Sequence, residues 1–366
     1  MKKRKSGIFL TMVPLVVFIL LFLIVPLVSM IHASFTKGGE GSFSLANYME
    51  IFTNPYYYQS FENSIIISIS STVVAMILAL FASYAITFFH KRTQDRILIL
   101  ANLTSNFAGI PLSFAFIVLL GNSGVFTILA EKLDVALLNH FNLYSWTGLI
   151  LIYIYFQLPL AVMLMFPAFH GIKEQWRESA YLLGASPLTF WKRISIPILL
   201  PSVAGTASIL FANSMGAYAS AYALTGSTYN LATIRIGALI SGDIFAQPEL
   251  GSALAVLLGV TLKKGKEGCR MKKIRLSFVP LVIVFAYLIV PLVATFLYSV
   301  STKWNQTVLP EGITFKWYTE LFSDGAFTSA VLRSLVLSGG ATVLSALFMV
   351  PAIFAIVVYA PRLEKG

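Results

Sequence analysis

Long apolar segments separated by short polar ones run along this 366-residue chain. A helix needs roughly 20 apolar residues to cross the hydrocarbon core of a bilayer. Runs of about this length lie at 8–30, 64–89, 97–120, 147–169, 198–224, 276–299 and 331–359. A shorter apolar run covers 250–262. The pattern predicts an all-α, polytopic membrane helical bundle.

The composition agrees with this class. The chain is 57% hydrophobic and only 11% charged, whereas soluble domains carry about 25% charged residues. Such a chain is suited to a lipid bilayer. Its net charge of +11 would also suit a nucleic acid, so the positions of the basic residues have to decide between these partners.

The Lys and Arg residues collect on one side of the predicted membrane. Four lie at the N-terminus, seven in the next two inner loops and nine in the later inner segments, so twenty of the 26 are cytoplasmic. This bias follows the positive-inside rule. It predicts that both termini are cytoplasmic and excludes nucleic acid as a partner. The first run predicts an uncleaved helix, because it is long for a signal peptide and no small-x-small site follows it before Lys37.

Residues that could carry catalysis or bind a metal are scarce. The single Cys269 excludes a disulfide framework and a cysteine-based metal site, and the four histidines show no metal-ligand spacing. No G-x4-G-K-[ST] phosphate loop occurs, so the chain has no ATP-binding motif of its own. We expect no catalytic residue, no metal and no cofactor.

One polar stretch, at 171–197, interrupts the apolar pattern far from either terminus. Its first half has high helix propensity, and Gly184 supplies a left-handed residue that commonly ends a helix. Ser186 before Pro187 is typical of an N-cap followed by proline at the first helical position. A second short helix would end near 194, with a return into the bilayer at Pro197. Helical spacing places four residues on one apolar face: Trp176, Ala180, Leu183 and Gly184.

The spacing in this stretch resembles the cytoplasmic EAA loop of ABC-importer permeases, the element that docks on the transport ATPase. The full pattern is E-A-A-x3-G-x9-I-x-L-P, and this chain departs from it only at Ser179 and Ile196. On periodicity alone, an ordinary amphipathic interfacial helix is the alternative. The resemblance assigns coupling to the ATPase to six residues: Glu178, Ser179, Ala180, Gly184, Ile194 and Pro197.

The resemblance implies the fold of an ABC importer permease, with about six helices, followed here by two more transmembrane helices. It also implies four partners: a cytoplasmic ABC ATPase, a second permease subunit, an extracytoplasmic substrate-binding protein and the lipid bilayer of a bacterial plasma membrane. The segments SLANYMEIF at 44–52 and ISGDIFAQPELGSALA at 240–255 are most similar to the spermidine/putrescine branch. A small polar organic solute such as a polyamine is therefore the expected substrate, while phosphonate, sulfate, iron and thiamine stay open.

The beginning of the chain recurs near residue 271. MKKRKSG at 1–7 is echoed by MKKIRLS at 271–277, and SLANYMEIF at 44–52 aligns with TFKWYTELF at 314–322. In the same register, three polar positions coincide: Ser64 and Ser334, Ser68 and Ser338, and Thr72 and Thr342. A repeat with so long a period indicates two homologous units.

We therefore divide the chain into three parts. Residues 1–262 form a permease transmembrane domain whose last helix is truncated, because 250–262 spans about 20 Å and the hydrocarbon core is roughly 30 Å thick. Residues 263–270 form a cytoplasmic basic junction, and 271–366 are the N-terminal fragment of a second homologous permease with two helices. A frameshift or misread gene boundary that joined two permease genes is one explanation, and a natural short linker is the alternative.

Polar side chains inside a bilayer are costly and face a cavity or another helix. Two tyrosines four residues apart could also guide an organic cation by cation–π attraction. The candidates for a substrate path are Asn102, Asn106, Gln157, Asn213, Tyr218 and Tyr222. Alternatively, these groups join helices or sit at the membrane interface. Pro159 and Pro167 in the fourth run and Gly216 in the fifth predict interruptions of those helices.

Other functions stay open beside that of a passive permease whose partner hydrolyses ATP. A secondary transporter or channel would carry ionisable residues deep in its spans and an inverted repeat, whereas both copies here begin with a basic cytoplasmic segment. A frameshifted gene pair could also yield a product that does not transport. A membrane enzyme is disfavoured, because no nucleophile–base or metal constellation is present.

Overall fold

The computed structural model describes residues 13–36, 43–133, 141–241, 246–261, 279–304 and 311–359. Over these residues the backbone is helical apart from turns, connecting segments and two isolated β-bridges, so the all-α prediction is confirmed. The predicted junction at 263–270 and Cys269 lie outside the described residues. Helices long and apolar enough to cross a membrane cover Val13–Ser34, Pro55–Ile86, Ile110–Leu133, Trp146–His170, Pro187–Met215 and Gly325–Pro351.

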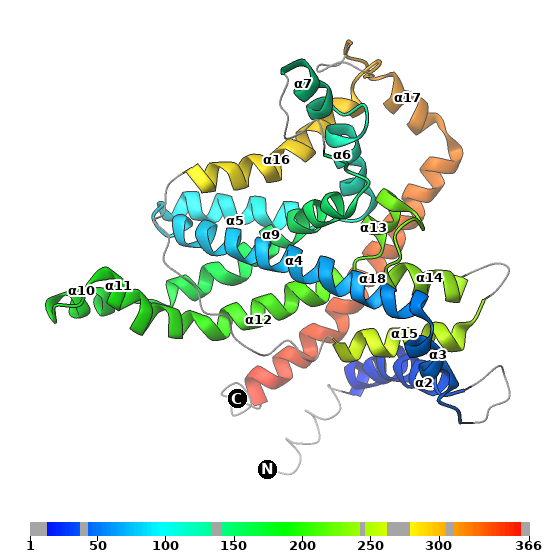
Figure 1. Ribbon diagram of the computed structural model, residues 1–366, viewed down its shortest axis with the longest axis horizontal. Helices are drawn as coiled ribbons and strands as arrows, with labels where there is room; N and C mark the ends of the chain where they lie inside the picture. Colours follow the sequence, from blue (N-terminus) through cyan, green and yellow to red (C-terminus); the bar gives the residue numbers. More distant parts are fainter. Residues whose placement is uncertain are drawn as a thin grey trace.

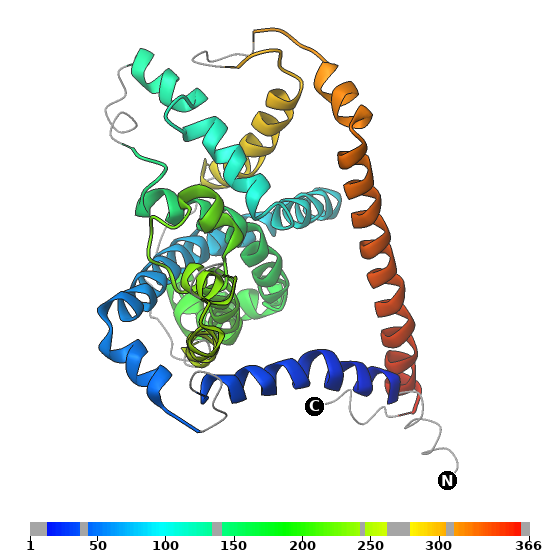
Figure 2. The ribbon, with the colours of Figure 1, turned by 90° about the vertical axis from the view of Figure 1, so that its right-hand side faces the viewer.

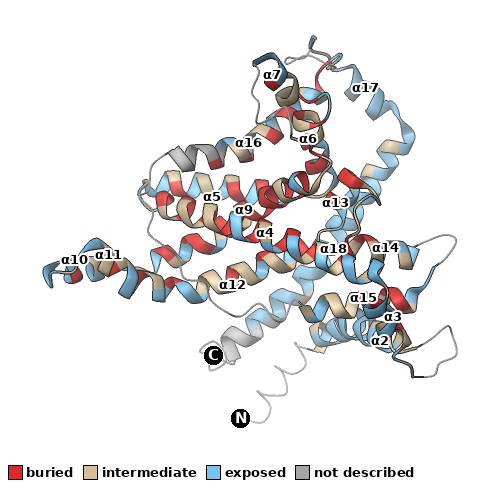
Figure 3. Ribbon diagram, in the orientation of Figure 1, coloured by how far each residue is buried: buried red, intermediate tan, exposed pale blue. Residues whose placement is uncertain are grey.

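The centre of the bundle is α9 (Trp146–His170), which packs against α4 (Pro55–Ile86), α5 (Lys91–Ser105) and α12 (Ile196–Met215) (Figure 1). Two-thirds of its most apolar window, 67%, is buried, and Figure 3 shows the buried residues concentrated here. A helix that is apolar all round is expected at the centre of such a bundle. Ser145 caps its start by accepting a hydrogen bond from the backbone N–H of Gly148.

The interruption predicted for the fourth apolar run is wrong. α9 continues through Pro159 and Pro167 as one helix of 25 residues. A proline removes one backbone hydrogen bond, but neighbouring helices pack around the site and support it. Both prolines therefore lie inside a continuous helix.

The third and fifth apolar runs are broken instead. The run predicted at 97–120 forms the end of α5 and, after a break at 106–109, α6 (Ile110–Leu120), which is followed by α7 (Val125–Leu133). The run predicted at 198–224 forms α12 and then α13 (Ala219–Thr225). Gly216 lies at the C-terminal end of α12, so the interruption predicted there is confirmed.

Four further helices complete the first unit beside α4. α15 (Pro248–Thr261) packs against α14 (Ala232–Ser241), α2 (Val25–Ser34) and α3 (Ala46–Thr53). Ahead of α2 lies a π-helical segment, η1 (Leu20–Ile24). The contact between α3 and α15 is a small apolar cluster made by Ile51, Leu250, Ala253 and Leu254. α15 has 14 residues, so it is a short helix, as its sequence predicts.

The second copy of the repeat contributes α16 (Val279–Ser299), α17 (Lys316–Ser323) and α18 (Gly325–Tyr359). α16 packs on the first unit beside α6, α4 and α9. Two hydrogen bonds cross this contact: Tyr155 donates to the carbonyl of Leu288 (2.6 Å) and Tyr287 donates to that of Leu151 (2.5 Å). α18, in contrast, stands apart from the bundle (Figure 2) and is exposed along most of its length (Figure 3).

The two copies repeat the same local structure. In both, an isolated β-bridge closes the turn after the first helix, at Thr36–Phe43 and at Ser301–Ile313. Three hydrogen bonds of the first copy recur in the second. The bond between Ser34 Oγ and Tyr48 OH (2.8 Å) matches that between Ser299 Oγ and Tyr318 OH (2.7 Å), and the bond from Ser44 N to Phe35 O (2.7 Å) matches that from Thr314 N to Val300 O (2.7 Å). The cap from Tyr56 N to Asn54 Oδ1 (3.0 Å) matches that from Ala326 N to Asp324 Oδ1 (2.8 Å). α16–α17–α18 is therefore a structural copy of α2–α3–α4.

Candidate coupling loop and membrane path

The polar loop forms two short helices that project from the bundle (Figure 1). They are α10 (Glu174–Leu182) and α11 (Pro187–Phe190). Between them Gly184 has φ +79°, its N–H donates to the carbonyl of Tyr181 (3.0 Å), and the N–H of Ala185 donates to that of Ala180 (2.9 Å). This pair of bonds is the Schellman motif, in which a left-handed glycine ends a helix. The helix end expected at Gly184 is confirmed.

The second short helix starts as predicted but ends differently. The side chain of Ser186 accepts a hydrogen bond from the N–H of Thr189, and Pro187 holds the first helical position. α11 then continues through a π-helical segment, η2 (Trp191–Ser195), directly into α12. The N–H of Ile196 donates to the carbonyl of Trp191, five residues back. The helix end expected near residue 194 is therefore wrong, because the π turn continues the helix and Pro197, in the first turn of α12, is accommodated there.

The tip of the loop is apolar and solvent-exposed. Leu182 and Leu183 are 89% and 87% exposed, and Trp176 and Tyr181 are partly exposed beside them. Ala180, expected on the same face, is only 7% exposed. It lies on the inner side of the turn, so the exposed apolar surface runs through Leu182 instead.

The remaining residues of the predicted coupling motif differ in exposure. Glu178, Ser179 and Gly184 are exposed, as is Pro197, whereas Ile194 is half-buried within η2. An ion pair between Glu174 and Arg177 supports the first turns of α10. Three of the four exposed residues thus lie on α10 or just after it, whereas Ile194 lies in η2 and Pro197 in the first turn of α12.

Aromatic contacts join the loop to the bundle. The ring of Trp191 meets that of Tyr84 edge-on with centroids 5.1 Å apart, and Tyr84 also contacts Phe169 at 5.8 Å. Within the loop, Tyr181 contacts Phe190 across the turn at 6.1 Å. Aromatic pairs of this geometry add to the area that they bury. They connect the projecting helices to α4, which in turn contacts α9 through Tyr84.

The two helix breaks lie against each other inside the bundle. The N–H of Gly109 donates to Ser220 Oγ (3.0 Å), and Ser113 Oγ donates to the carbonyl of Ser220 (2.9 Å). Gly109 has φ +75°, and a Cβ there would lie 3.6 Å from the Cβ of Ala219. Non-helical backbone inside a membrane is tolerated where protein or a water-filled cavity provides hydrogen-bond partners for its N–H and C=O groups. Two broken helices in contact are the arrangement that transporters use around substrate sites.

Five of the six predicted path residues flank these breaks. Asn102 precedes the first break and Asn106 lies at its start. Both are exposed, and Asn106 Nδ2 donates to the carbonyl of Asn102 (2.8 Å). Asn213 precedes the second break and is also exposed. Tyr218 and Tyr222 follow it with their rings stacked, centroids 5.3 Å apart and planes at 16°.

Gln157 does not join this group. It is fully buried, donates to Ser71 Oγ (2.9 Å) and accepts from Thr72 Oγ1 (3.2 Å). Ser71 is in turn within hydrogen-bond distance of Ser214 Oγ (3.3 Å). These bonds link α4, α9 and α12, which corresponds to the interhelical alternative for this residue.

Sequence reasoning missed Gly109 and Ser220, which join the two breaks. Gly109 is followed by Pro111, and a glycine just before a proline that starts a helix is a recognisable signal for a break. Ser220 carries no such signal, because a serine between apolar residues is ordinary in a membrane helix.

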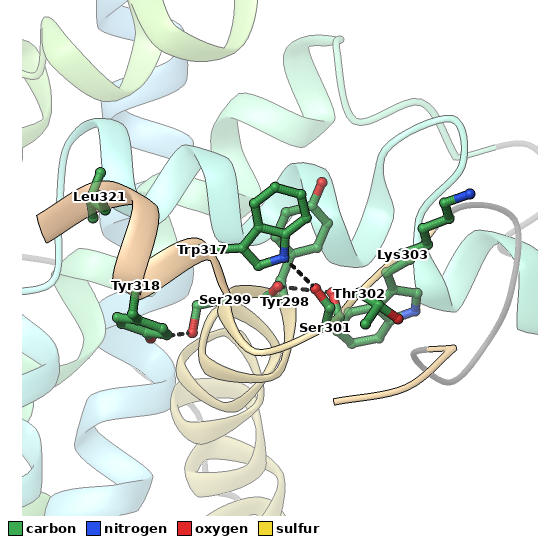
Figure 4. Close-up of a pocket in the computed structure, with 9 residues that line it drawn as sticks. Tyr298, Ser299, Ser301, Thr302, Lys303, Trp317, Tyr318 and Leu321 are labelled. Atoms are coloured by element: carbon green, nitrogen blue, oxygen red, sulfur yellow. Dashed lines mark hydrogen bonds between the residues drawn. The ribbon is translucent and has the colours of Figure 1, made fainter. Parts of the chain in front are cut away.

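A cavity of about 410 Å³ lies in the second copy, apart from the loop and the breaks (Figure 4). Its wall includes Trp317, whose Nε1 donates to the carbonyl of Ser301 (2.7 Å), and Tyr318, which bonds Ser299 (2.7 Å). The other lining residues are Tyr298, Thr302, Lys303, Trp304 and Leu321.

No protein-family model matches the chain. It is 27% identical over 212 residues to a probable sulfate transport system permease protein of Helicosporidium sp. subsp. Simulium jonesii, covering 57% of this chain and 73% of that protein. It is 20% identical over 366 residues to a probable ABC transporter permease protein of Sinorhizobium fredii, covering 91% of this chain but only 63% of that protein. It is 22% identical over 245 residues to the spermidine/putrescine transport system permease protein PotC of Haemophilus influenzae, covering 66% and 88%.

Among solved structures, a bacterial ABC transporter involved in the import of the acidic polysaccharide alginate has a TM-score of 0.56 and 15% identity. The likeness covers 79% of this chain and 96% of that one. It shows the fold. The chain contains helices long and apolar enough to cross a membrane and is similar to ABC transporter permeases, which are transport subunits and not enzymes. The fold of its bundle is similar to that of this alginate transporter.

Proposed function

We propose that the chain is the membrane subunit of an ABC importer, which opens and closes a substrate path while a separate ATPase hydrolyses ATP. The observation that carries this is the loop 171–197. It presents two almost fully exposed leucines, Leu182 and Leu183, on a projecting turn. Exposed apolar side chains of this size on a rigid protrusion indicate a protein partner. The Schellman bonds at Gly184 and the contact of Trp191 with Tyr84 hold the protrusion in one shape.

The proposed partners are a cytoplasmic ABC ATPase, a second permease subunit and an extracytoplasmic substrate-binding protein. A solved relative supports the last of these, since a bacterial alginate ABC transporter was determined in complex with an alginate pentasaccharide-bound periplasmic protein. Its chain is 14% identical to this one with a TM-score of 0.56. We place the protein in the plasma membrane of a bacterium with both termini cytoplasmic, as the distribution of Lys and Arg favours.

The division at 1–262, 263–270 and 271–366 is part of the proposal. The repeated hydrogen bonds of α2–α4 and α16–α18 support two homologous units. A natural two-unit chain is favoured by the Sinorhizobium fredii permease, because a match that covers 91% of this chain has to include residues of both units. A gene fusion by frameshift is the alternative, and its product could be inactive in transport. Sequencing of the locus and the mass of the native protein distinguish the two.

For the substrate we propose a small polar organic solute, with a polyamine as the first candidate. The stacked rings of Tyr218 and Tyr222 beside the helix breaks support a cation, because aromatic faces attract organic cations. The names of the relatives include sulfate, spermidine/putrescine and alginate, so the test includes all three classes. Equilibrium binding of each to the cognate binding protein would identify the substrate.

The coupling role is tested by charge on the apolar tip. Leu182→Glu and Leu183→Glu should abolish uptake into vesicles that contain the complete transporter, while the chain inserts normally. Gln175→Glu is the matched control, because it adds the same charge to an exposed position of α10 away from the tip. Full uptake by the leucine variants would refute the proposal. Uptake that persists without any ATPase would instead favour a secondary transporter or channel.

A further inference from the structure

Tyr84 lies where the helix that leaves the projecting loop meets two helices of the bundle. It is in the last turn of α4. Its ring meets that of Trp191 in η2 edge-on, with centroids 5.1 Å apart, and contacts that of Phe169 near the end of α9 at 5.8 Å. The ring of Phe88 packs edge-on against the same ring at 4.9 Å. The Tyr84 ring thus joins η2 to both α4 and α9.

The contact with Trp191 falls at a weak point of a long helix. α11, η2 and α12 form one continuous helix, Pro187–Met215 (Figure 1). Within η2 the N–H of Ile196 donates to a carbonyl five residues back, and such a π turn is a place where helices bend. Ser195, the buried residue of η2, has a hydroxyl without a hydrogen-bond partner among the described residues. Support for this segment therefore comes from ring contacts, which Tyr84 provides from α4.

The far end of the same helix is held by hydrogen bonds. Ser214 Oγ lies within hydrogen-bond distance of Ser71 Oγ on α4 (3.3 Å). Just beyond the end of α12, the carbonyl of Ala217 accepts a hydrogen bond from Tyr153 OH on α9 (3.0 Å). A displacement of the loop can reach these bonds along the helix only if the helix does not bend at η2.

The second copy of the repeat also has an aromatic ring at this position. Phe354 on α18 corresponds to Tyr84 on α4, in the register in which Thr342 matches Thr72. Phe354 has no hydroxyl group, so the feature that the two copies share is the ring. This agrees with the contacts of Tyr84, which are made by its ring.

We propose that Tyr84 is a positioning residue for the coupling of ATP hydrolysis to transport. Its ring holds η2 against α4 and α9, so that a displacement of α10 and α11 moves Pro187–Met215 as one body and reaches the break at Gly216. Without the ring, η2 bends and the displacement stays in the loop. This inference rests on the proposed function, because it assigns to Tyr84 a role in transmission from the ATPase to the substrate path.

The test follows the far end of the helix and needs no knowledge of the substrate. Asn213 is exposed and precedes the break, so Asn213→Cys, combined with Cys269→Ser, gives a single reporter thiol. The full chain is purified with its ATPase, and the rate at which a water-soluble maleimide labels position 213 is measured with and without ATP and vanadate. The nucleotide should change this rate in the parent chain. Tyr84→Leu should remove the change while ATP hydrolysis continues, and Tyr84→Phe should retain it, because the ring contacts remain.

Tyr229 provides the matched control. It is half-buried, as Tyr84 is, and its ring meets that of Trp146 edge-on at 6.3 Å, at the opposite end of α9 from Phe169. Tyr229→Leu removes an aromatic contact of the same kind without touching η2. The response of position 213 to nucleotide should therefore remain in this variant.

A Tyr84→Leu chain that still responds to nucleotide would overturn the proposal. Loss of the response in Tyr229→Leu as well would also overturn it, because general destabilisation would then explain both results. If Tyr84→Leu fails to insert, Trp191→Leu removes the same contact from the side of η2 and should lose the response; a retained response there would count equally against the proposal.

The parent chain separates this inference from the proposed function. If the parent binds no ATPase, the proposed function itself fails. If it binds the ATPase and Tyr84→Leu responds as the parent does, only the role of Tyr84 is wrong. A parent that binds the ATPase but shows no response at position 213 would also refute the inference, because no displacement then reaches the break.

Discussion

Gly184 offers the sharpest test of the coupling loop, because its backbone conformation can be perturbed without a clash. Its φ of +79° is left-handed, and a Cβ added there meets no atom within 4 Å. The cost of a substitution is therefore conformational alone, about 1–2 kcal/mol for an ordinary L-residue. Since 1.4 kcal/mol corresponds to about a factor of ten, this changes the equilibrium constant between the intact and the opened turn by a factor of about five to thirty.

The assay is uptake and ATP hydrolysis by the complete transporter in vesicles, with the ATPase at limiting concentration. Gly184→Val should lower uptake about five- to thirtyfold, because β-branched residues fit this conformation worst. Gly184→Asn should retain most of the uptake, since asparagine tolerates left-handed backbone. The thermal stability of the bundle should stay unchanged in both, because the turn is exposed and projects from it.

Equal uptake by the Val and Asn variants would refute this reasoning, whether both are active or both inactive. Equal activity would mean that the turn need not be formed, and equal inactivity would mean that glycine is needed for a close contact. A Val variant that fails to insert would show that the loop stabilises the bundle, contrary to its exposed position.

Further predictions concern the stability of the bundle in detergent. Gln157→Leu should cost about 1–2 kcal/mol and lower the Tm by about 2–8 °C, because it removes two buried interhelical bonds. Tyr155→Phe and Tyr287→Phe should each cost about 0.6 kcal/mol, and together they should increase proteolysis between the first unit and α16; unchanged proteolysis would mean that apolar packing alone holds α16. Gly109→Ala should cost about 1–3 kcal/mol, because its φ of +75° and ψ of −143° lie in a region that is essentially restricted to glycine, whereas Gly205→Ala, inside α12, should be neutral or stabilising. If Gly205→Ala lowered the Tm more than Gly109→Ala does, the assignment of the break at Gly109 would be contradicted.

The parts of the structure that the sequence predicts are those governed by local preferences. The end of α10 at Gly184 and the cap at Ser186 follow from the backbone preferences of glycine, serine and proline over a few residues. The membrane spans follow from transfer free energies that add along a window. Both kinds of signal are contained within one segment, so no knowledge of packing is needed.

The helix breaks are less visible for a physical reason. Hydropathy measures how well a segment dissolves in lipid and carries no information on its backbone path, so the apolar run at 97–120 conceals the break at Gly109. The opposite error was made at Pro159 and Pro167, where an interruption was predicted and the helix is continuous. Proline weakens a helix, but the neighbouring helices support α9 at both positions. In both cases the outcome depends on the helices packed around the site.

The environment of Gln157 could not be predicted from the sequence either. Its partners Ser71 and Thr72 are more than 80 residues away in sequence, and their approach depends on how α4 and α9 cross. Its amide could have lined a path or joined helices, and the residue type suits both. The exposed pair Tyr218 and Tyr222, by contrast, follows directly from a four-residue spacing on one helix.

The unbroken passage from α11 through η2 into α12 has a mechanical consequence. Pro187–Met215 forms one helical rod of 29 residues, about 40 Å long. One end bears the exposed turn at Gly184, and the other ends at Gly216, next to the break that Ser220 joins to Gly109. A tilt of about 10° would carry the far end of such a rod roughly 7 Å. A tilt of this size about the turn would therefore displace the end of the rod where the two broken helices meet.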